Sequence, residues 1–173
     1  MRLILTQSLH PLVDHGDVAD LFLNEFVKIP TYVQATLLGV LDGGDFSRVG
    51  SASKVMRSDV KFIAATNKKI REVLDTGELL EDLFYRLHHH RIQIPPLRER
   101  VEDIVPLARH FIDHFNAEFG KEVRGLTVEA VRLLESHPWE GNVRELRNAV
   151  ERAMLFAEGE ELTPADLSTI AER

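Results

Sequence analysis

The sequence predicts an α/β fold in its first half and a helical subdomain in its second half. Two runs, DLFLN (20–24) and VKFIAAT (60–66), are apolar and of strand length, and helical patterns stand between and after them. Beyond Pro95-Pro96 the apolar residues recur at helical spacing. Strands mixed with helices, followed by helices alone, indicate an α/β piece that carries a helical subdomain, with a boundary near the proline pair.

The composition is that of an ordinary globular protein, and its charge is acidic. Hydrophobic residues make up 44% and charged residues 28% of the 173 residues, and 21 basic against 28 acidic residues give a formal charge of −7. That balance argues against a free-standing, non-specific DNA binder. The chain has no cysteine, which excludes disulfides and fits a reducing cytoplasm. The first apolar run is too short for a signal peptide or a membrane span, so we expect a cytoplasmic protein without a membrane partner.

Short strands and helices alternate in the first half. Pro30 suits the start of a helix, and Gly43-Gly44 ends it. Residues 1–18 stay unassigned, except that Arg2 to Thr6 has the composition of a short strand. The expected elements are a strand over 20–24, a helix over 30–42, a Gly- and Ser-rich hairpin-like excursion over 46–55, a strand over 60–66, a short helix ending before Gly77, a helix over 81–87 and a strand over 90–94.

The second half contains amphipathic helices, each with a start or stop signal. These signals are Gly120 after the first helix, Thr127 before the second, Asn142 before the third and Thr163-Pro164 before a short last one. The apolar faces of the long helices carry Ile104, Leu107, Ala108, Phe111, Ile112 and Phe115, then Val128, Val131 and Leu134, then Val143, Leu146, Val150 and Ala153.

Five segments resemble, in order, the parts of one ATPase domain. LFLNEF (21–26) is similar to its Walker B strand, and DVKFIAATN (59–67) is similar to its sensor I strand. EDLFYRLHHHRIQIPPLRERVEDI (81–104) is similar to the run that holds its arginine fingers and hinge. The others are IPTYVQATLLGVLDGGDFSRVGS (29–51), similar to the helix and turn after Walker B, and HPWEGNVRELRNAVERA (137–153), similar to the sensor II helix. Together they resemble the C-terminal part of the AAA+ ATPase domain of sigma-54-dependent transcriptional activators.

The resemblance implies a ring ATPase that binds ATP between subunits and remodels the sigma-54 form of bacterial RNA polymerase. It implies a partial parallel AAA+ sheet with flanking helices, followed by an all-α helical lid. We therefore expect an unassigned segment over 1–18, a truncated α/β core over 19–97 and the lid over 98–173. The family's strand order leaves a gap between the sensor I strand and the strand near 90–94, and a gap exposes two ladder edges. We predict that RLILT (2–6) pairs there.

Two family motifs are missing from the 173 residues. The phosphate cradle GxxxxGK[ST], whose backbone N–H groups and lysine wrap the phosphates, does not occur, since Gly120-Lys121 continues with Glu122. The Gly-Ala-Phe-Thr-Gly-Ala loop, through which the family contacts sigma-54, does not occur either. The family implies ATP and magnesium as cofactors, but the missing cradle argues against their binding by these residues and against hydrolysis by the chain alone.

The Walker B and sensor I strands each end in residues that match catalytic positions. Glu25 matches the residue that polarises the attacking water, and a solvated acid at a strand end is the alternative. Asn24 stands where the family has an aspartate for magnesium, and a neutral amide is a poorer ligand for a hard dication. Asn67 matches sensor I, whose amide orients water or a phosphate oxygen, and a turn residue that ends a strand is the alternative.

Two arginines match positions that act on the nucleotide. Arg86 matches the second arginine finger, which the family offers to the ATP of the neighbouring subunit, whereas Leu80 replaces the first finger. For Arg86 the alternative is an ordinary surface residue of a helix. Arg144 matches sensor II, which joins the lid to the nucleotide, and an ion pair with a glutamate on the same helix is the alternative.

The histidines do not predict a metal site. Successive residues of a strand point to opposite faces, so His88-His89-His90 cannot converge on one ion. His110 and His114 have a zinc-like i, i+4 spacing, but neither a cysteine nor a third ligand accompanies them.

Three functions remain open from the sequence. The chain is an inactive relative that docks on itself or on intact AAA+ subunits through the Arg86 face, or it is one part of a split working ATPase. A DNA-binding module is the third, since residues 142–157 resemble a recognition helix in isolation, but the acidic charge disfavours it and we expect no direct DNA binding. Sigma-54 RNA polymerase is the partner that the family implies, although the contact loop is missing.

Overall fold

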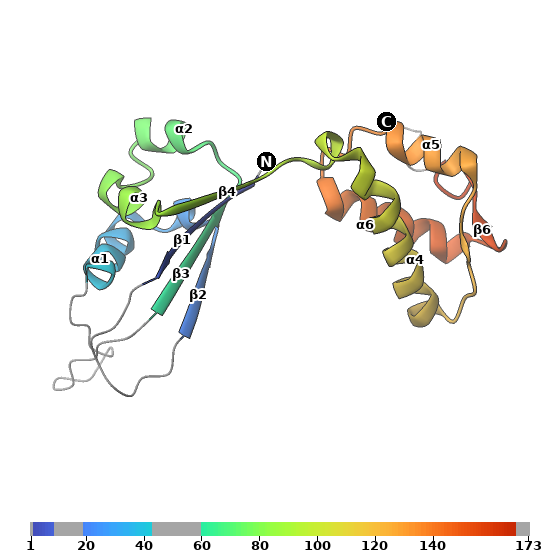
Figure 1. Ribbon diagram of the computed structural model, residues 1–173, viewed down its shortest axis with the longest axis horizontal. Coiled ribbons are helices and arrows are strands. Elements are labelled where there is room, and N and C mark those ends of the chain that lie inside the picture. Colours follow the sequence, from blue (N-terminus) through green and yellow to red (C-terminus); the bar gives the residue numbers. More distant parts are fainter. Residues whose placement is uncertain (1, 9–18, 43–59, 169–173) are drawn as a thin grey trace. The chain divides into compact units, whose positions relative to one another are not determined.

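The computed structural model describes residues 2–8, 19–42 and 60–168. The hairpin-like excursion expected over 46–55 therefore lies outside the described residues. Contacts divide the chain into two units, Met1–Ile94 and Pro95–Arg173. In Figure 1 the first unit runs in colour from blue to green and contains a sheet, and the second runs from green to red and is mainly helical.

A four-stranded sheet with the order β2-β3-β1-β4 organises the first unit. Its strands are β1 (Arg2–Ser8), β2 (Ala19–Asn24), β3 (Val60–Thr66) and β4 (His90–Ile94). Strand β1 pairs with β3, with Leu3 opposite Thr66, and also with β4, with Arg2 opposite Ile94. The prediction that RLILT fills the gap between these two strands is therefore confirmed.

The direction of β1 differs from the parallel sheet that was expected. Strands β2 and β3 run parallel, but β1 is antiparallel to both of its neighbours, so the sheet is mixed. An antiparallel strand satisfies the ladder groups of both neighbours as well as a parallel strand does. The α/β class and the flanking helices agree with the expectation.

Three helices gather on one face of this sheet (Figure 1). They are α1 (Thr31–Leu41), α2 (Ile70–Asp75) and α3 (Glu81–Leu87). A 3-10 turn, η1 (Phe26–Lys28), follows β2, and Pro30 is the N-cap of α1 rather than its first residue. The buried core between helices and sheet consists of Phe26, Val27, Leu41, Phe62, Ala64, Val73, Leu79, Leu83 and Leu87.

The second unit contains α4 (Ile104–Phe119), α5 (Val128–Ser136) and α6 (Asn142–Phe156), after the 3-10 turns η2 (Leu97–Glu99) and η3 (Val101–Asp103). Gly120 ends α4 with a φ of 66°, a left-handed conformation that glycine adopts with little strain. Thr127 caps α5, because its Oγ1 accepts a hydrogen bond of 3.2 Å from the N–H of Ala130. Both sequence signals are confirmed.

The core of the second unit surrounds Trp139, which is fully buried. Its Nε1 donates a hydrogen bond of 2.8 Å to the carbonyl of Leu134, so the polar atom of this large side chain is satisfied. The two-residue strands β5 (Gly125–Leu126) and β6 (Glu161–Leu162) pair in parallel. They add a small sheet to a lid for which only helices were expected.

Two of the expected helix starts are different in the structure. Gly141, not Asn142, is the N-cap of α6, and the Oδ1 of Asn142 accepts a hydrogen bond of 2.7 Å from the N–H of Leu97. The prediction for Asn142 was wrong because its side chain ties the start of η2 to α6 instead. At Thr163, Asp166 Oδ2 accepts from both the N–H and the Oγ1, and a turn over 164–167 follows.

Candidate functional site

The carboxyl ends of β2 and β3 bring the residues that resemble Walker B and sensor I to one edge of the sheet. The two strands are parallel and in register, with Asn24 opposite Ala65. Each strand therefore ends at the same edge, and Glu25 and Asn67 follow directly after those ends. Parallel pairing explains why residues so far apart in the sequence lie together.

The Glu25 carboxylate is fixed against the end of β3. Its Oε2 accepts hydrogen bonds from the N–H of Asn67 at 3.3 Å and from the Oγ1 of Thr66 at 3.4 Å. Thr66 is fully buried, and its Oγ1 accepts in turn from the N–H of Lys68 at 3.1 Å. Glu25 also has a left-handed backbone, with a φ of 53°, which is uncommon for a residue with a side chain. Such strain is typical of residues held in place for a function.

The two asparagines are exposed at this edge. Asn24 is the last residue of β2, and Asn67 is the first residue after β3. Asn67 contacts Glu25 through its backbone N–H, which leaves its side-chain amide exposed to solvent. The structure thus brings together three of the predicted site residues, namely Glu25, Asn67 and Asn24.

Arg86 lies elsewhere in the first unit, on α3. Its Nε forms an ion pair of 2.6 Å with Oδ1 of Asp42, the C-cap residue of α1, and about half of the Arg86 side chain is exposed. Leu80, which replaces the other expected finger, is the N-cap of α3 and packs against the buried core. No pattern in the sequence predicts the Arg86–Asp42 pair, because it joins two helices that are distant along the chain.

Arg144 belongs to the second unit, where it is exposed in the first turn of α6. Its neighbour Arg147 is the arginine that forms the i, i+4 ion pair, at 3.3 Å from Glu151. The Arg147 guanidinium also lies 5.3 Å from the ring centre of Phe115. The pairing considered for Arg144 is therefore made by Arg147, and Arg144 extends into solvent.

The residues at the strand ends do not fit a magnesium ion by themselves. Glu25 offers a carboxylate, but Asn24 offers only a neutral amide, and the 173 residues contain no GxxxxGK[ST] cradle. Within the described parts of the chain, no group of three His, Cys, Asp or Glu side chains is placed to hold a metal ion. His114 instead contacts Glu118 at 3.5 Å, and Nδ1 of His89 lies 3.0 Å from the carbonyl oxygen of Arg86.

Two protein families match nearly all of the chain. The sigma-54 interaction domain family matches residues 7–93, and the AAA+ ATPase lid domain family matches residues 98–172. Nitrogen fixation protein AnfA of Azotobacter vinelandii is 43% identical over 145 residues, which are 84% of this chain and 27% of that protein. The DNA-binding transcriptional regulator NtrC of Rhizobium meliloti (strain 1021) is 45% identical over 139 residues, 80% of this chain and 28% of that protein.

Solved structures give the same result. NtrX from Brucella abortus in complex with ATP superposes with a TM-score of 0.76 at 36% identity, over 84% of this chain and 35% of that chain. The complex of NtrX with ADP gives a TM-score of 0.75 at 35% identity. The chain thus spans about a quarter to a third of the length of these relatives. None of the helices that the structure describes is long and apolar enough to cross a membrane.

Proposed function

Because the chain belongs to the sigma-54 interaction domain family of AAA+ proteins, we propose that it supplies the water-polarising, sensor and lid positions of an ATPase site and does not hydrolyse ATP alone. One contact carries this proposal. Glu25 is held beside Asn67 at the strand ends, although the sequence has no phosphate cradle. The left-handed backbone of Glu25 and the two hydrogen-bond donors to its Oε2 support a fixed position for this carboxylate.

Glu25 is the residue that we assign to the attacking water. Both of its donors bind Oε2, so Oε1 has no donor among the residues that the structure describes. A carboxylate oxygen in this position can accept a hydrogen bond from water and, as a general base, accept the proton of that water as it attacks a phosphate. Asn67 presents its amide at the same edge, where it can orient that water or a phosphate oxygen.

Arg86 and Arg144 supply positive charge from two different elements. Asp42 holds Arg86 at the surface of α3 through its Nε, and the guanidinium remains half exposed for a phosphate from a neighbouring subunit. Exposed ion pairs contribute little free energy, so Arg86 can release Asp42 and bind a phosphate instead. Arg144 extends from the first turn of α6, where it can join the lid to a bound nucleotide.

The partners follow from the family. We propose sigma-54 RNA polymerase as the target of the complete machine, with the contact made by a loop that these residues do not contain. Copies of the chain or other AAA+ subunits are the partners for the Arg86 face. We expect no direct DNA binding, because the formal charge is −7 and phosphate contacts require a basic surface.

Reconstitution tests this proposal. Magnesium-dependent ATP hydrolysis is measured for the chain alone and for the chain mixed with a separate polypeptide that carries the phosphate-loop part of a relative. We expect background turnover alone, restored turnover in the mixture, and loss of the restored turnover with Glu25→Gln. Glu72→Gln, an exposed acid on α2, is the matched control and should keep the activity. Restored turnover that is insensitive to Glu25→Gln would contradict the role of Glu25.

A non-enzymatic role is the second candidate, and the surface of α3 favours it. Tyr85 is 62% exposed and stands next to Arg86 on this helix. Tyrosine and arginine are enriched at the centres of protein interfaces. In this role the chain docks on intact AAA+ subunits without taking part in chemistry. Tyr85→Ala would then weaken docking, as measured by co-purification with a relative, whereas Glu25→Gln would leave docking unchanged.

A further inference from the structure

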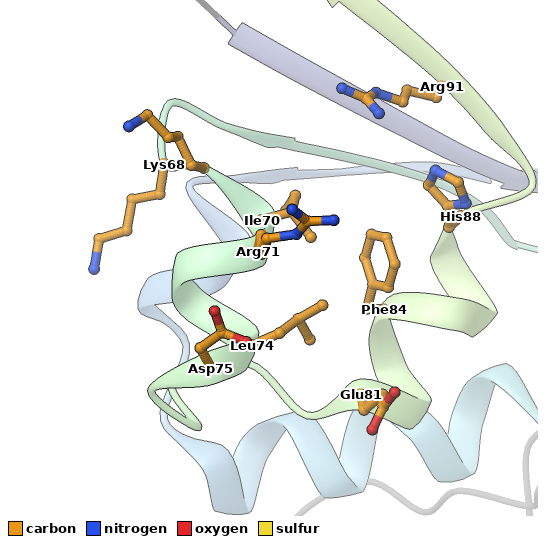
Figure 2. Close-up of a pocket in the computed structure, with 10 residues that line it drawn as sticks. Lys68, Ile70, Arg71, Leu74, Asp75, Glu81, Phe84, His88 and Arg91 are labelled. Atoms are coloured by element: carbon orange, nitrogen blue, oxygen red, sulfur yellow. The ribbon is translucent and has the colours of Figure 1, made fainter.

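A cavity of about 710 Å³ lies between α2, α3 and the start of β4 in the first unit (Figure 2). None of Glu25, Asn67, Arg86 and Arg144 lines it, although Lys68 at its rim directly follows Asn67. Pockets for small organic ligands typically measure about 300–1,000 Å³. The cavity therefore has room for a ligand of nucleotide size.

One end of the cavity is cationic. Arg91 and His88 lie at this end, and the side chain of Arg71 extends from α2 toward the ring of Phe84 (Figure 2). Neither Arg71 nor Arg91 forms an ion pair with a carboxylate within the described parts of the chain, and Arg91 contacts only the amide of Gln93, at 3.1 Å. Two guanidinium groups thus face one space with no acidic partner among the residues that the structure describes, an arrangement that suits a phosphate.

The lysines at the rim do not share this role. Lys68 is paired with Glu78, and Nζ of Lys69 lies 2.9 Å from Oε1 of Glu72. Their charges are compensated by neighbouring carboxylates. Among the described residues, the positive charge that no carboxylate compensates in this cavity therefore comes from the two arginines.

The middle of the cavity is apolar and the far end is acidic. Ile70, Leu74 and Phe84 form the middle, and the Phe84 ring already lies 4.8 Å from the His88 ring. Asp75 and Glu81 lie at the far end (Figure 2). A flat ring can pack against Phe84, while an amino group on that ring can donate to a carboxylate at the acidic end.

We propose that this cavity binds a nucleoside phosphate whose base carries an amino group. Arg71 and Arg91 bind the phosphate, Phe84 stacks on the base, and Asp75 or Glu81 accepts from the amino group. The site is distinct from the ATPase site proposed at the strand ends, and it needs neither a phosphate cradle nor a second chain.

Titration of the full chain with AMP, followed by amide chemical shifts and by calorimetry, tests the proposal. Shifts are expected in α2, α3 and β4. Arg71→Gln and Arg91→Gln should each weaken AMP binding by about ten-fold or more, which is the usual effect of losing a charge-assisted hydrogen bond. Both side chains are exposed, so these variants should fold normally. Arg109→Gln, an exposed arginine on α4, is the matched control and should bind AMP unchanged.

Further probes separate the parts of the ligand and the two sites. Adenosine should bind more weakly than AMP, because it lacks the phosphate, and inosine monophosphate should bind more weakly because it lacks the amino group. The double variant Asp75→Ala with Glu81→Ala, which removes both acceptors, should remove the preference for AMP over inosine monophosphate. Glu25→Gln and Arg144→Gln should leave AMP binding unchanged. Absence of AMP binding, or binding that depends on Glu25 or Arg144 and not on Arg71 and Arg91, would overturn the proposal.

Discussion

Gln34 is the polar side chain that fixes α1 to the segment leading into α3. It is fully buried, and its Nε2 donates to the carbonyls of Ile29 at 2.7 Å and Glu78 at 2.8 Å. Its Oε1 accepts from the N–H of Leu80 at 2.9 Å. All three partners are backbone groups, and Leu80 is the N-cap of the helix that carries Arg86. Replacing Gln34 by leucine keeps the approximate volume and removes all three hydrogen bonds.

The expected cost follows from the backbone groups that lose their partner. A buried polar group left without a partner costs about 1–3 kcal/mol. The partners of Gln34 are only partly buried, so water can reach some of them, and the low end of that range applies to each. Gln34→Leu should therefore lower the free energy of unfolding of the first unit by about 3 kcal/mol. With a urea m-value of about 1–3 kcal/mol/M, the midpoint should fall by about 1–3 M.

Urea unfolding with two probes measures this change separately in each unit. Trp139 is the single tryptophan of the chain and lies in the second unit, so its fluorescence reports that unit alone. Far-ultraviolet circular dichroism reports both units. Gln34→Leu should shift the circular dichroism transition to lower urea and leave the tryptophan transition in place. The control is Thr36→Ala on the same helix, whose exposed Oγ1 donates to Tyr32, and it should shift neither by more than about 0.5 kcal/mol.

Two results would contradict this role for Gln34. A circular dichroism midpoint unchanged by Gln34→Leu would mean that the three hydrogen bonds contribute nothing net. An equal shift of both transitions would mean that the two units unfold together. The boundary near residue 94 would then not separate two independently unfolding units.

Three further substitutions have defined outcomes. Asn142→Ala removes the acceptor of the Leu97 N–H and should destabilise the second unit by about 1–3 kcal/mol, measured by tryptophan fluorescence in urea. Gly120→Ala meets no atom within 4 Å of the added Cβ, so its cost of about 1 kcal/mol, measured in the same way, should arise from the φ of 66° alone. The hydrogen bond from Lys68 lowers the pKa of Glu78, so the stability that this pair contributes should be complete above the ordinary pKa of Glu78 and be lost as the pH falls through the lowered pKa. Glu78→Gln should remove that part of the pH dependence in circular dichroism melts, and an unaltered profile would contradict it.

Local patterns in the sequence predicted the elements of the fold well. DLFLN and VKFIAAT are strands because both are apolar along their whole length, and RLILT pairs with the sheet because two ladder edges had to be satisfied. The direction of that strand was not predictable, since either direction satisfies the same edges. Resemblance to the family gave the positions of Glu25 and Asn67, but the hydrogen bonds between them depend on the register of β2 and β3.

Features that depend on packing between distant segments were not predictable. Asn142 has the composition of a helix cap, but tertiary contact with Leu97 uses its side chain instead. Nothing in the sequence predicts a partner for Asp42. It forms an ion pair with Arg86 because α1 ends beside α3, where Arg86 lies. The cavity beside Arg71 and Arg91 likewise forms only when α2, α3 and β4 come together.

The rate of magnesium-dependent ATP hydrolysis by the purified chain tests the central claim most directly. We expect no turnover above background, because no backbone cradle or lysine compensates the charge of the triphosphate. Asn24→Asp should not restore turnover, and neither should Asn24→Asp combined with Leu80→Arg, which in addition places a charge against the core cluster. The claim that these residues need a phosphate loop from elsewhere would be contradicted by one result. In that result the chain or either variant hydrolyses ATP at a rate typical of AAA+ ATPases, and Glu25→Gln abolishes the turnover.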